Sequence, residues 1–284
     1  MAHRKLEELV GGIDFGEGPR WRDDRLWYSD FFQRAVYTVD LDGKRETILE
    51  LDDSPSGLGW LPNGDLLVVS MHRRQVLRYD GTQTVVHADL SELAPGRCND
   101  MVVSAEGHAW VGNFGRAPDG GGLLEPTRLI HVAPDGAARP VGPPLGFPNG
   151  TVITPDGGTL IVGESIGRRI SAFSIAADGA LDAHRVFAET PGRAPDGACL
   201  DAEGGFWFAD AAQPGCAVVR VADGGEELDV IEAPQPTFAC ALGGPERKHL
   251  FVLTAPSSNE EKVAGKGEGV LFVTEVAVPG AGIP

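Results

Sequence analysis

Residues 193–210, RAPDGACLDAEGGFWFAD, decide the fold. Within them, the carboxylate of Asp196 precedes a short apolar run, a tight turn rich in Asp, Glu and Gly follows, and a second apolar run ends the stretch. Two short apolar runs joined by such a turn are typical of a β-hairpin. The stretch therefore predicts two short antiparallel strands with a charged residue where the first strand begins.

The same pattern occurs six times along the chain. The residues at which the first strands begin are Glu17, Ser56, Asn99, Asn149, Asp196 and Phe238. These positions are 39 to 50 residues apart, and further strand-like runs follow the hairpins. A repeat of this length with four short strands is typical of one β-propeller blade. We therefore predict an all-β, six-bladed β-propeller that forms a single domain over residues 1–284.

The sixth unit is one strand short. After its hairpin it has only the apolar run GVLFVTEVAV, residues 269–278. Residues 5–10 near the N-terminus would supply the missing outer strand and would leave no broken blade in the ring. We predict that the ring is closed by this N-terminal strand joining the last blade.

Composition limits the partners. The formal net charge of −17 argues against nucleic acid, because phosphate binding needs a basic face. No run has the length of a membrane span or a signal peptide. The four cysteines show no CxxC pair or zinc-ligand spacing, which indicates free thiols in a reducing compartment. We expect a cytoplasmic protein with a small-molecule substrate and no nucleic-acid or membrane partner, and the oligomeric state stays open.

Propeller topology brings the six first-strand starts to one end of the central channel. Glu17 and Asp196 would place two carboxylates near the axis there, and two buried carboxylates repel unless a cation lies between them. With the amide oxygen of Asn149, they are donors suited to Ca²⁺, Mg²⁺ or Mn²⁺. Three protein ligands would leave positions for water and substrate. For each residue alone, a turn or strand-cap role is the alternative.

Four motifs carry a family resemblance. GEGPRW at 16–21, RCND at 97–100, FPNG at 147–150 and PDGACLDAEGGFW at 195–207 resemble, in order and spacing, the SMP-30/gluconolactonase/LRE family, which includes regucalcin. The resemblance implies a six-bladed propeller that binds one divalent cation and hydrolyses sugar lactones such as gluconolactone. Ca²⁺ is favoured for that cation, with Mg²⁺, Mn²⁺ or Zn²⁺ as alternatives.

The resemblance also implies roles for particular residues. Glu17, Asn149 and Asp196 would hold the metal, Asp196 would also act as catalytic general base, and Arg97 and Asn99 would bind substrate. The chemistry agrees, because a lactone carbonyl needs an electrophile and the attacking water needs a base. For Arg97 the alternative is a surface ion pair.

Three further residues complete the predicted substrate-binding set. Asp100 follows Asn99 directly, and its alternative role is to shape the turn. Phe114 and His72 fall in loops after second strands, at the rim of the channel, where aromatic side chains suggest a substrate with some apolar surface. Gln213 falls in a similar loop, and two long loops, 115–126 and 255–269, would be lids or plain surface loops.

We therefore predict a gluconolactonase-like, divalent-metal-dependent hydrolase of sugar lactones or related cyclic esters. One alternative is a propeller enzyme that uses the same cation on another electrophile, as a phosphotriester hydrolase, a lyase or an isomerase. Another is a non-catalytic, calcium-binding regulatory protein whose ion only ties the blades together. Substrate profiling separates the enzymes, and metal removal separates the binding protein from them.

Overall fold

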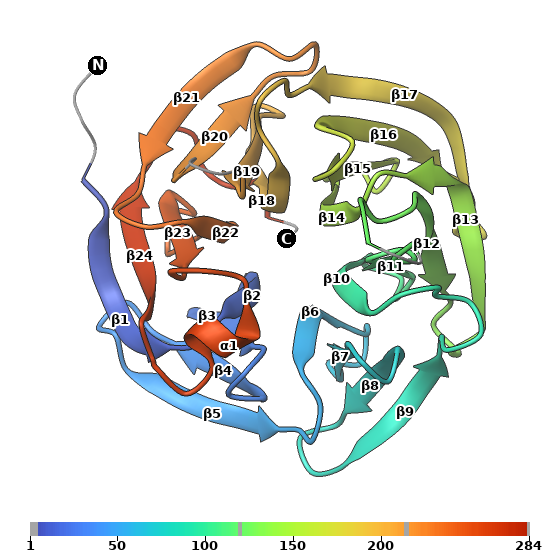
Figure 1. Ribbon diagram of the computed structural model, residues 1–284, viewed down its shortest axis with the longest axis horizontal. Coiled ribbons are helices and arrows are strands. Elements are labelled where there is room, and N and C mark those ends of the chain that lie inside the picture. The colour runs from blue at the N-terminus through green and yellow to red at the C-terminus, as the bar shows by residue number, and fades with distance from the viewer. Residues whose placement is uncertain (1–4, 119–120, 213–215, 283–284) are drawn as a thin grey trace.

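The computed structural model describes residues 5–118, 121–212 and 216–282, and its strands form six four-stranded antiparallel sheets arranged in a ring (Figure 1). The first sheet comprises β2 (Gly16–Arg22), β3 (Arg25–Asp30), β4 (Ala35–Val39) and β5 (Arg45–Glu50). The second comprises β6 (Pro55–Trp60), β7 (Leu66–Ser70), β8 (Gln75–Tyr79) and β9 (Thr84–Asp89). The third comprises β10 (Cys98–Val103), β11 (Ala109–Asn113), β12 (Thr127–Val132) and β13 (Ala138–Leu145).

The fourth sheet comprises β14 (Pro148–Ile153), β15 (Thr159–Glu164), β16 (Arg169–Ile175) and β17 (Leu181–Glu189). The fifth comprises β18 (Pro195–Leu200), β19 (Phe206–Asp210), β20 (Ala217–Val221) and β21 (Glu227–Glu232). The sixth comprises β22 (Thr237–Gly243), β23 (His249–Thr254), β24 (Gly269–Glu275) and β1 (Glu7–Ile13). In each blade the strand with the predicted entrance residue lies innermost (Figure 1). The six-bladed propeller is confirmed.

The N-terminal strand closes the ring. β1 pairs antiparallel with β24, so the sheet order of the last blade is β22, β23, β24, β1. The strand begins at Glu7 and continues to Ile13, three residues beyond the predicted segment. The pairing joins the two ends of the chain in one blade, which confirms the predicted closure.

The hydrophobic core lies between the blades. Among the described residues, six buried apolar clusters each fill the space between two neighbouring blades. Trp110 lies in the cluster between blades 3 and 4, and Trp207 in the cluster between blades 5 and 6, both about 1% exposed. Because each blade packs on two neighbours, the positions of the inner strands are fixed from both sides.

The remaining elements are few. In the described part of the chain, the short helix α1 (Glu260–Val263) lies in the loop between β23 and β24. None of the helices described is long and apolar enough to cross a membrane. Cys98, Cys199, Cys216 and Cys240 are free thiols, as expected.

Candidate active site

Every inner strand has a β-bulge at the end where its entrance residue lies. A bulge leaves residues outside the regular pairing and turns their side chains in a new direction. Ser56, Asn99, Asn149, Asp196 and Phe238 all lie within such irregularities, and Glu17 directly precedes one. The pairing register shifts between Glu17 and Arg20, Pro55 and Leu58, Cys98 and Met101, Pro148 and Thr151, Pro195 and Ala198, and Thr237 and Ala239.

Glycines after three of these residues let neighbouring inner strands approach closely. A Cβ atom on Gly57 or Gly150 would lie 2.3 Å from a backbone atom of the next inner strand, and one on Gly197 would lie 2.5 Å from a neighbouring side-chain carbon. Such distances are too short for any larger residue without movement of the strands. The close approach of β14 and β18 brings Asn149 beside Asp196.

Glu17 and Asp196 are both buried, at 5% and 8% exposure. Burial raises the pKa of Glu17 well above its usual range, and the charges of Asp196 and Asp100 raise it further. Burial, with a smaller contribution from Asp100, raises the pKa of Asp196 to about 8. The Asp196 Oδ1 atom is buried and accepts no hydrogen bond from the described residues. Two buried carboxyl groups that repel one another and have so few hydrogen-bond donors around them indicate a site that binds a positive charge.

A chain of hydrogen bonds joins four blades and orients Asn149. Ser56 Oγ donates to Asn99 Oδ1 at 3.2 Å, and Asn99 Nδ2 donates to Asn149 Oδ1 at 3.2 Å. Asn149 Nδ2 donates to Ser165 Oγ at 3.2 Å, and Ser165 Oγ donates to the Pro195 carbonyl at 2.6 Å. The Asn149 side-chain oxygen, Oδ1, keeps one lone pair for another partner. Asn99 therefore holds the Asn149 amide in position.

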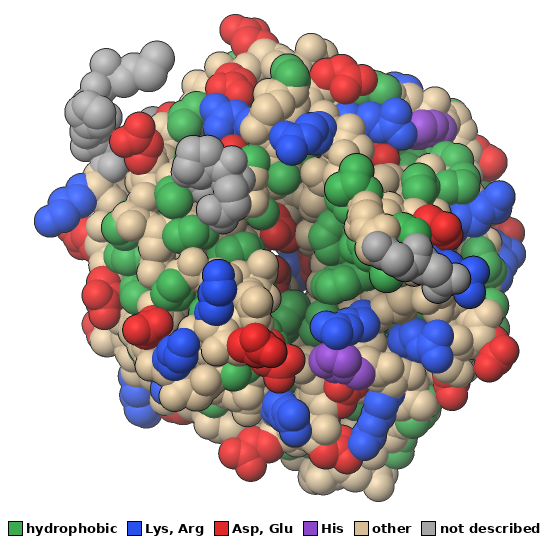
Figure 2. All heavy atoms as spheres, in the orientation of Figure 1, with side chains coloured by type: hydrophobic (Ala, Val, Ile, Leu, Met, Phe, Trp, Pro, Cys, Tyr) green, Lys and Arg blue, Asp and Glu red, His purple; other side chains and the backbone are tan. Residues whose placement is uncertain are grey.

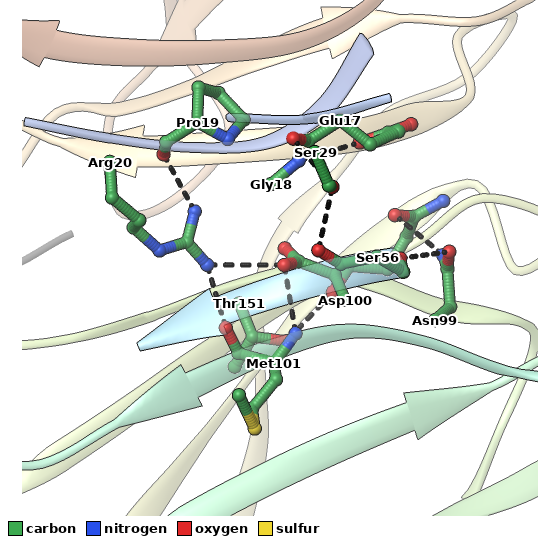
Figure 3. Close-up of polar contacts among 11 residues, drawn as sticks. Glu17, Gly18, Pro19, Arg20, Ser29, Ser56, Asn99, Asp100, Met101 and Thr151 are labelled. Carbon is green, nitrogen blue, oxygen red and sulfur yellow. Dashed lines mark hydrogen bonds and ion pairs between the residues drawn. The ribbon is translucent and has the colours of Figure 1, made fainter. Parts of the chain in front are cut away.

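Asp100 lies on the inner strand β10 and pairs with Arg20, a residue that the sequence analysis did not single out (Figure 3). The Arg20 guanidinium contacts the Asp100 carboxylate at 3.1 Å, with both side chains at most 4% exposed. It also donates to the carbonyls of Pro19 and Met101. Asp100 does not line the cavity at the centre of the ring, which is described below. The structure therefore places it in a buried ion pair, and its predicted contact with substrate has no support from the geometry.

The buried charges of the channel fit a divalent cation. Glu17, Asp100 and Asp196 supply three negative charges when ionised, and Arg20 supplies one positive charge, which leaves two negative charges. Among the described residues, no group of three or more His, Cys, Asp or Glu side chains is arranged as a metal site. The candidate donors are instead two carboxylates and the Asn149 amide. Oxygen donors of this kind suit a hard divalent ion.

A cavity of about 460 Å³ lies above these residues and is lined by Glu17, Asn99, Asn149 and Asp196 at its base. Figure 2 shows the hollow at the centre of the ring, with hydrophobic side chains around its opening. The predicted residues Arg97, Phe114 and His72 also line the cavity. All the predicted site residues except Asp100 therefore line the cavity, and the Asp100 charge acts on Glu17 and Asp196 from outside that lining.

The three rim residues differ in how they are held. Arg97 is exposed, and its guanidinium makes no hydrogen bond or ion pair in the part of the chain that the structure describes. His72 is 43% exposed, and its Nδ1 atom lies 2.8 Å from Asp53 Oδ1. Phe114 is half-buried and packs edge-to-face on Phe147 at 4.8 Å between ring centroids. Arg97 is therefore the rim group whose charge is open to a ligand.

The loop at 255–269 is held against the body of the protein. The Gly265 and Gly267 N–H groups donate to the buried carboxylate of Asp14 at 2.7 and 2.8 Å. Ser258 of this loop lines the cavity. Of the other predicted rim elements, Gln213 and part of the loop at 115–126 lie outside the described residues. The anchored loop is part of the cavity wall.

Four further acidic residues have a structural role. Asp30, Asp53, Glu164 and Asp210 are buried and accept backbone N–H groups of the loops that flank the first two strands of their blades. Three of them end a second strand, in YSD, VGE and FAD, so the sequence contained the signal. Part of the strong negative charge therefore fixes the loops around the cavity.

Comparison with known proteins places the chain among characterised relatives. A family model described as SMP-30/Gluconolactonase/LRE-like region matches residues 15–256. The chain is 30% identical to the pentonolactonase XacC of Haloferax volcanii over an alignment of 284 positions, which covers 93% of this chain and 92% of that protein.

Two solved structures are also similar. A gluconolactonase from Xanthomonas campestris superimposes with a TM-score of 0.76 and 25% identity, over 97% of this chain and 90% of the other. A structure described as a calcium-binding protein, regucalcin, from Agrobacterium tumefaciens superimposes with a TM-score of 0.81 and 22% identity, over 100% and 99%. The latter likeness supports the propeller fold alone.

Proposed function

The chain belongs to the SMP-30/gluconolactonase/LRE-like family, and we propose that it is a lactone hydrolase that depends on one divalent cation. The names of the relatives, a pentonolactonase and a gluconolactonase, support the lactonase class. The observation that carries the cation dependence is the pair of buried carboxylates, Glu17 and Asp196, at the base of the cavity. A small-molecule substrate fits a cavity of about 460 Å³.

Glu17, Asn149 and Asp196 would hold the cation. These residues line one cavity from blades 1, 4 and 5, and the Asp196 Oδ1 atom supplies a donor that no described residue engages. Ca²⁺ is our first choice because the donors are all oxygen, with Mg²⁺, Mn²⁺ and Zn²⁺ as alternatives. When bound, the cation supplies an electrophile that draws electron density from the lactone carbonyl.

The protein's own residues would move the proton and orient the substrate. Asp196 accepts the proton of the attacking water as the water adds to the lactone carbonyl, and it returns that proton to the leaving ring oxygen. Arg97 donates hydrogen bonds to the polar end of the substrate. Asn99 holds the Asn149 amide in position and donates no proton in the reaction. The product is the open hydroxy acid.

The proposal is tested by two substitutions that change charge and little else. Glu17→Gln should weaken calcium affinity in a calorimetric titration by at least tenfold, because it removes a buried negative charge at the site. Asp196→Asn should lower kcat for lactone hydrolysis by about 10²-fold or more through loss of the base. Asp182→Asn makes the same chemical change on the exposed outer strand β17 and serves as the control.

Each result can contradict the proposal. If Glu17→Gln binds calcium as tightly as the wild type, the cation lies elsewhere. If Asp196→Asn hydrolyses a lactone at the wild-type rate while keeping its melting temperature, Asp196 takes no part in the chemistry.

A further inference from the structure

One side of the cavity is a continuous aromatic wall, formed by Phe15, Phe31, Phe32 and Phe238. The Phe15 ring lies 5.1 Å from Phe31, 5.8 Å from Phe32 and 4.6 Å from Phe238 between centroids. Phe15, Phe31 and Phe238 are at most 7% exposed, and Phe32 is half-buried. Because the rings pack on one another, they form a rigid apolar surface contributed by blades 1 and 6.

A second aromatic surface contributes to the cavity from blades 3 and 4. Phe114 and Phe147 meet edge-to-face, at 4.8 Å and 89° between rings, and both rings are half-buried. Leu124 and Ile166 line the cavity with them. The cavity is thus apolar on two sets of blades above a polar base.

The backbone at Phe147 is unusual for a bulky residue. Its φ angle is +63°, in the left-handed region that favours glycine. This conformation is held by hydrogen bonds from Phe147 N–H to the Leu145 carbonyl and from Ser165 N–H to the Phe147 carbonyl, at 3.1 and 3.0 Å. Strained backbone conformations cluster at functional sites, and the Phe147 ring lies in the cavity wall.

The cavity offers few free partners for hydroxyl groups. The Asn99 amide already bonds Ser56 and Asn149 and keeps one N–H and one lone pair, Ser165 Oγ donates to the Pro195 carbonyl, and His72 Nδ1 pairs with Asp53. Arg97 is the charged group of the lining that stays open. The hydroxyl groups of a polyhydroxylated lactone that face the aromatic walls would have no partner there and would lose their bonds to water. An apolar substituent would meet no such penalty.

We infer that the substrate is a lactone carrying an apolar substituent about the size of an aromatic ring, with the substituent against the aromatic walls and the carbonyl over Glu17, Asn149 and Asp196. The inference rests on the proposed lactonase function. It assigns specificity to Phe147 and to the wall on Phe15, which no role in catalysis explains. A substituted lactone differs from the sugar lactones in that its recognition comes from burial of apolar area.

The test compares kcat/KM for three lactones: γ-phenyl-γ-butyrolactone, γ-methyl-γ-butyrolactone and D-glucono-1,5-lactone. We expect the phenyl compound to be preferred over the methyl compound by about tenfold or more, as burial of one ring predicts. The gluconolactone should be the poorest of the three. A preference for gluconolactone, or equal values for phenyl and methyl, would overturn the inference and leave the lactonase function intact.

Binding of compounds that cannot be hydrolysed separates the two claims. The cyclic ketones 3-phenylcyclopentanone and 3-methylcyclopentanone have the shape of the lactones without the ester. If no lactone is hydrolysed with any cation, the lactonase function fails, and the ketones still test the walls by calorimetry. Tighter binding of the phenyl ketone supports the apolar site, and equal binding of the two overturns it.

Phe147→Gly tests the strained ring directly. Glycine adopts the left-handed backbone without strain, which offsets part of the stability lost with the ring, so the melting temperature should fall less than it would for loss of the ring alone. The ratio of kcat/KM for the phenyl lactone to that for the methyl lactone should drop by about fivefold or more. Arg247→Gly is the matched control, because Arg247 also has a positive φ, of 56°, and lies in the hairpin turn between β22 and β23 outside the cavity. An unchanged ratio in Phe147→Gly would show that the ring does not contact the substituent.

Discussion

Gly150→Ala should separate two of the proposed cation ligands without changing either ligand side chain. Gly150 follows Asn149 on β14, where that strand passes closest to β18. A Cβ atom at this position would lie 2.3 Å from the Asp196 carbonyl oxygen and 2.5 Å from the Ala198 nitrogen. Both contacts are with backbone, so no side-chain rotation relieves them. The added methyl group must push the two inner strands apart.

The size of the effect follows from these distances. Ordinary van der Waals contact begins near 3.4 Å, so the strands must separate by about 1 Å at the point where Asn149 and Asp196 meet. Overpacking of this kind costs about 3 kcal/mol. For a chain of this length, that loss corresponds to a fall in melting temperature of roughly 6–10 °C. A displacement of 1 Å should also weaken cation binding by tenfold or more, since ligand geometry is held by the two strands.

The assay is thermal unfolding with and without Ca²⁺, together with calorimetric titration of the cation. Gly158→Ala is the control, because it lies in the hairpin of the same blade and a Cβ atom there would meet only contacts of 3.5 Å and more. The control should lose little stability and no affinity. If Gly150→Ala melted within 2 °C of the wild type and bound calcium equally well, close approach of β14 and β18 would not be what positions the ligands.

Three further predictions concern the other parts of the account. Arg20→Met should lower the free energy of unfolding by about 3 kcal/mol by leaving the Asp100 carboxylate buried and unpaired, and a second change, Asp100→Asn, should restore part of it in denaturant titrations. If Arg20→Met kept the wild-type free energy of unfolding, or if Asp100→Asn recovered none of the loss, the pair would not be buried in solution. Burial lowers the pKa of His131 to about 4, from an ordinary value of 6.5. Between these two pH values the unfolded chain therefore binds a proton at His131 that the folded protein does not bind. The stability of the wild type relative to His131→Gln should fall as the pH drops from 6.5 to 4. A stability difference that did not change with pH would contradict this. Arg97→Ala should raise KM for polar substrates and leave calcium affinity unchanged, and loss of the cation instead would make Arg97 structural.

The repeat was visible in the sequence because each blade encodes its own hairpin. Alternating short apolar runs and glycine-rich turns are local signals, so the six units and the closing strand could be predicted without any knowledge of contacts between blades. The entrance residues Glu17, Asn149 and Asp196 could be grouped at the channel because the topology alone places equivalent positions around one axis.

What the sequence did not reveal depends on neighbouring blades. The glycines after Ser56, Asn149 and Asp196 are an example, because Gly57, Gly150 and Gly197 are needed only where inner strands touch. The Arg20 and Asp100 pair joins residues 80 positions apart, so no local pattern signals it. For the same reason the sequence cannot show that the Asp100 carboxylate pairs with an arginine of another blade.

The central claim, a lactonase that depends on a divalent cation held by Glu17, Asn149 and Asp196, is tested most directly by lactone hydrolysis with chelator-stripped protein. Ca²⁺, Mg²⁺, Mn²⁺ and Zn²⁺ are restored one at a time, and initial rates are measured for sugar lactones and substituted γ-lactones. We predict that the stripped protein is inactive and that hydrolysis returns with one of these ions, Ca²⁺ first among them. Full activity in the stripped protein, or none with any ion, would contradict the claim.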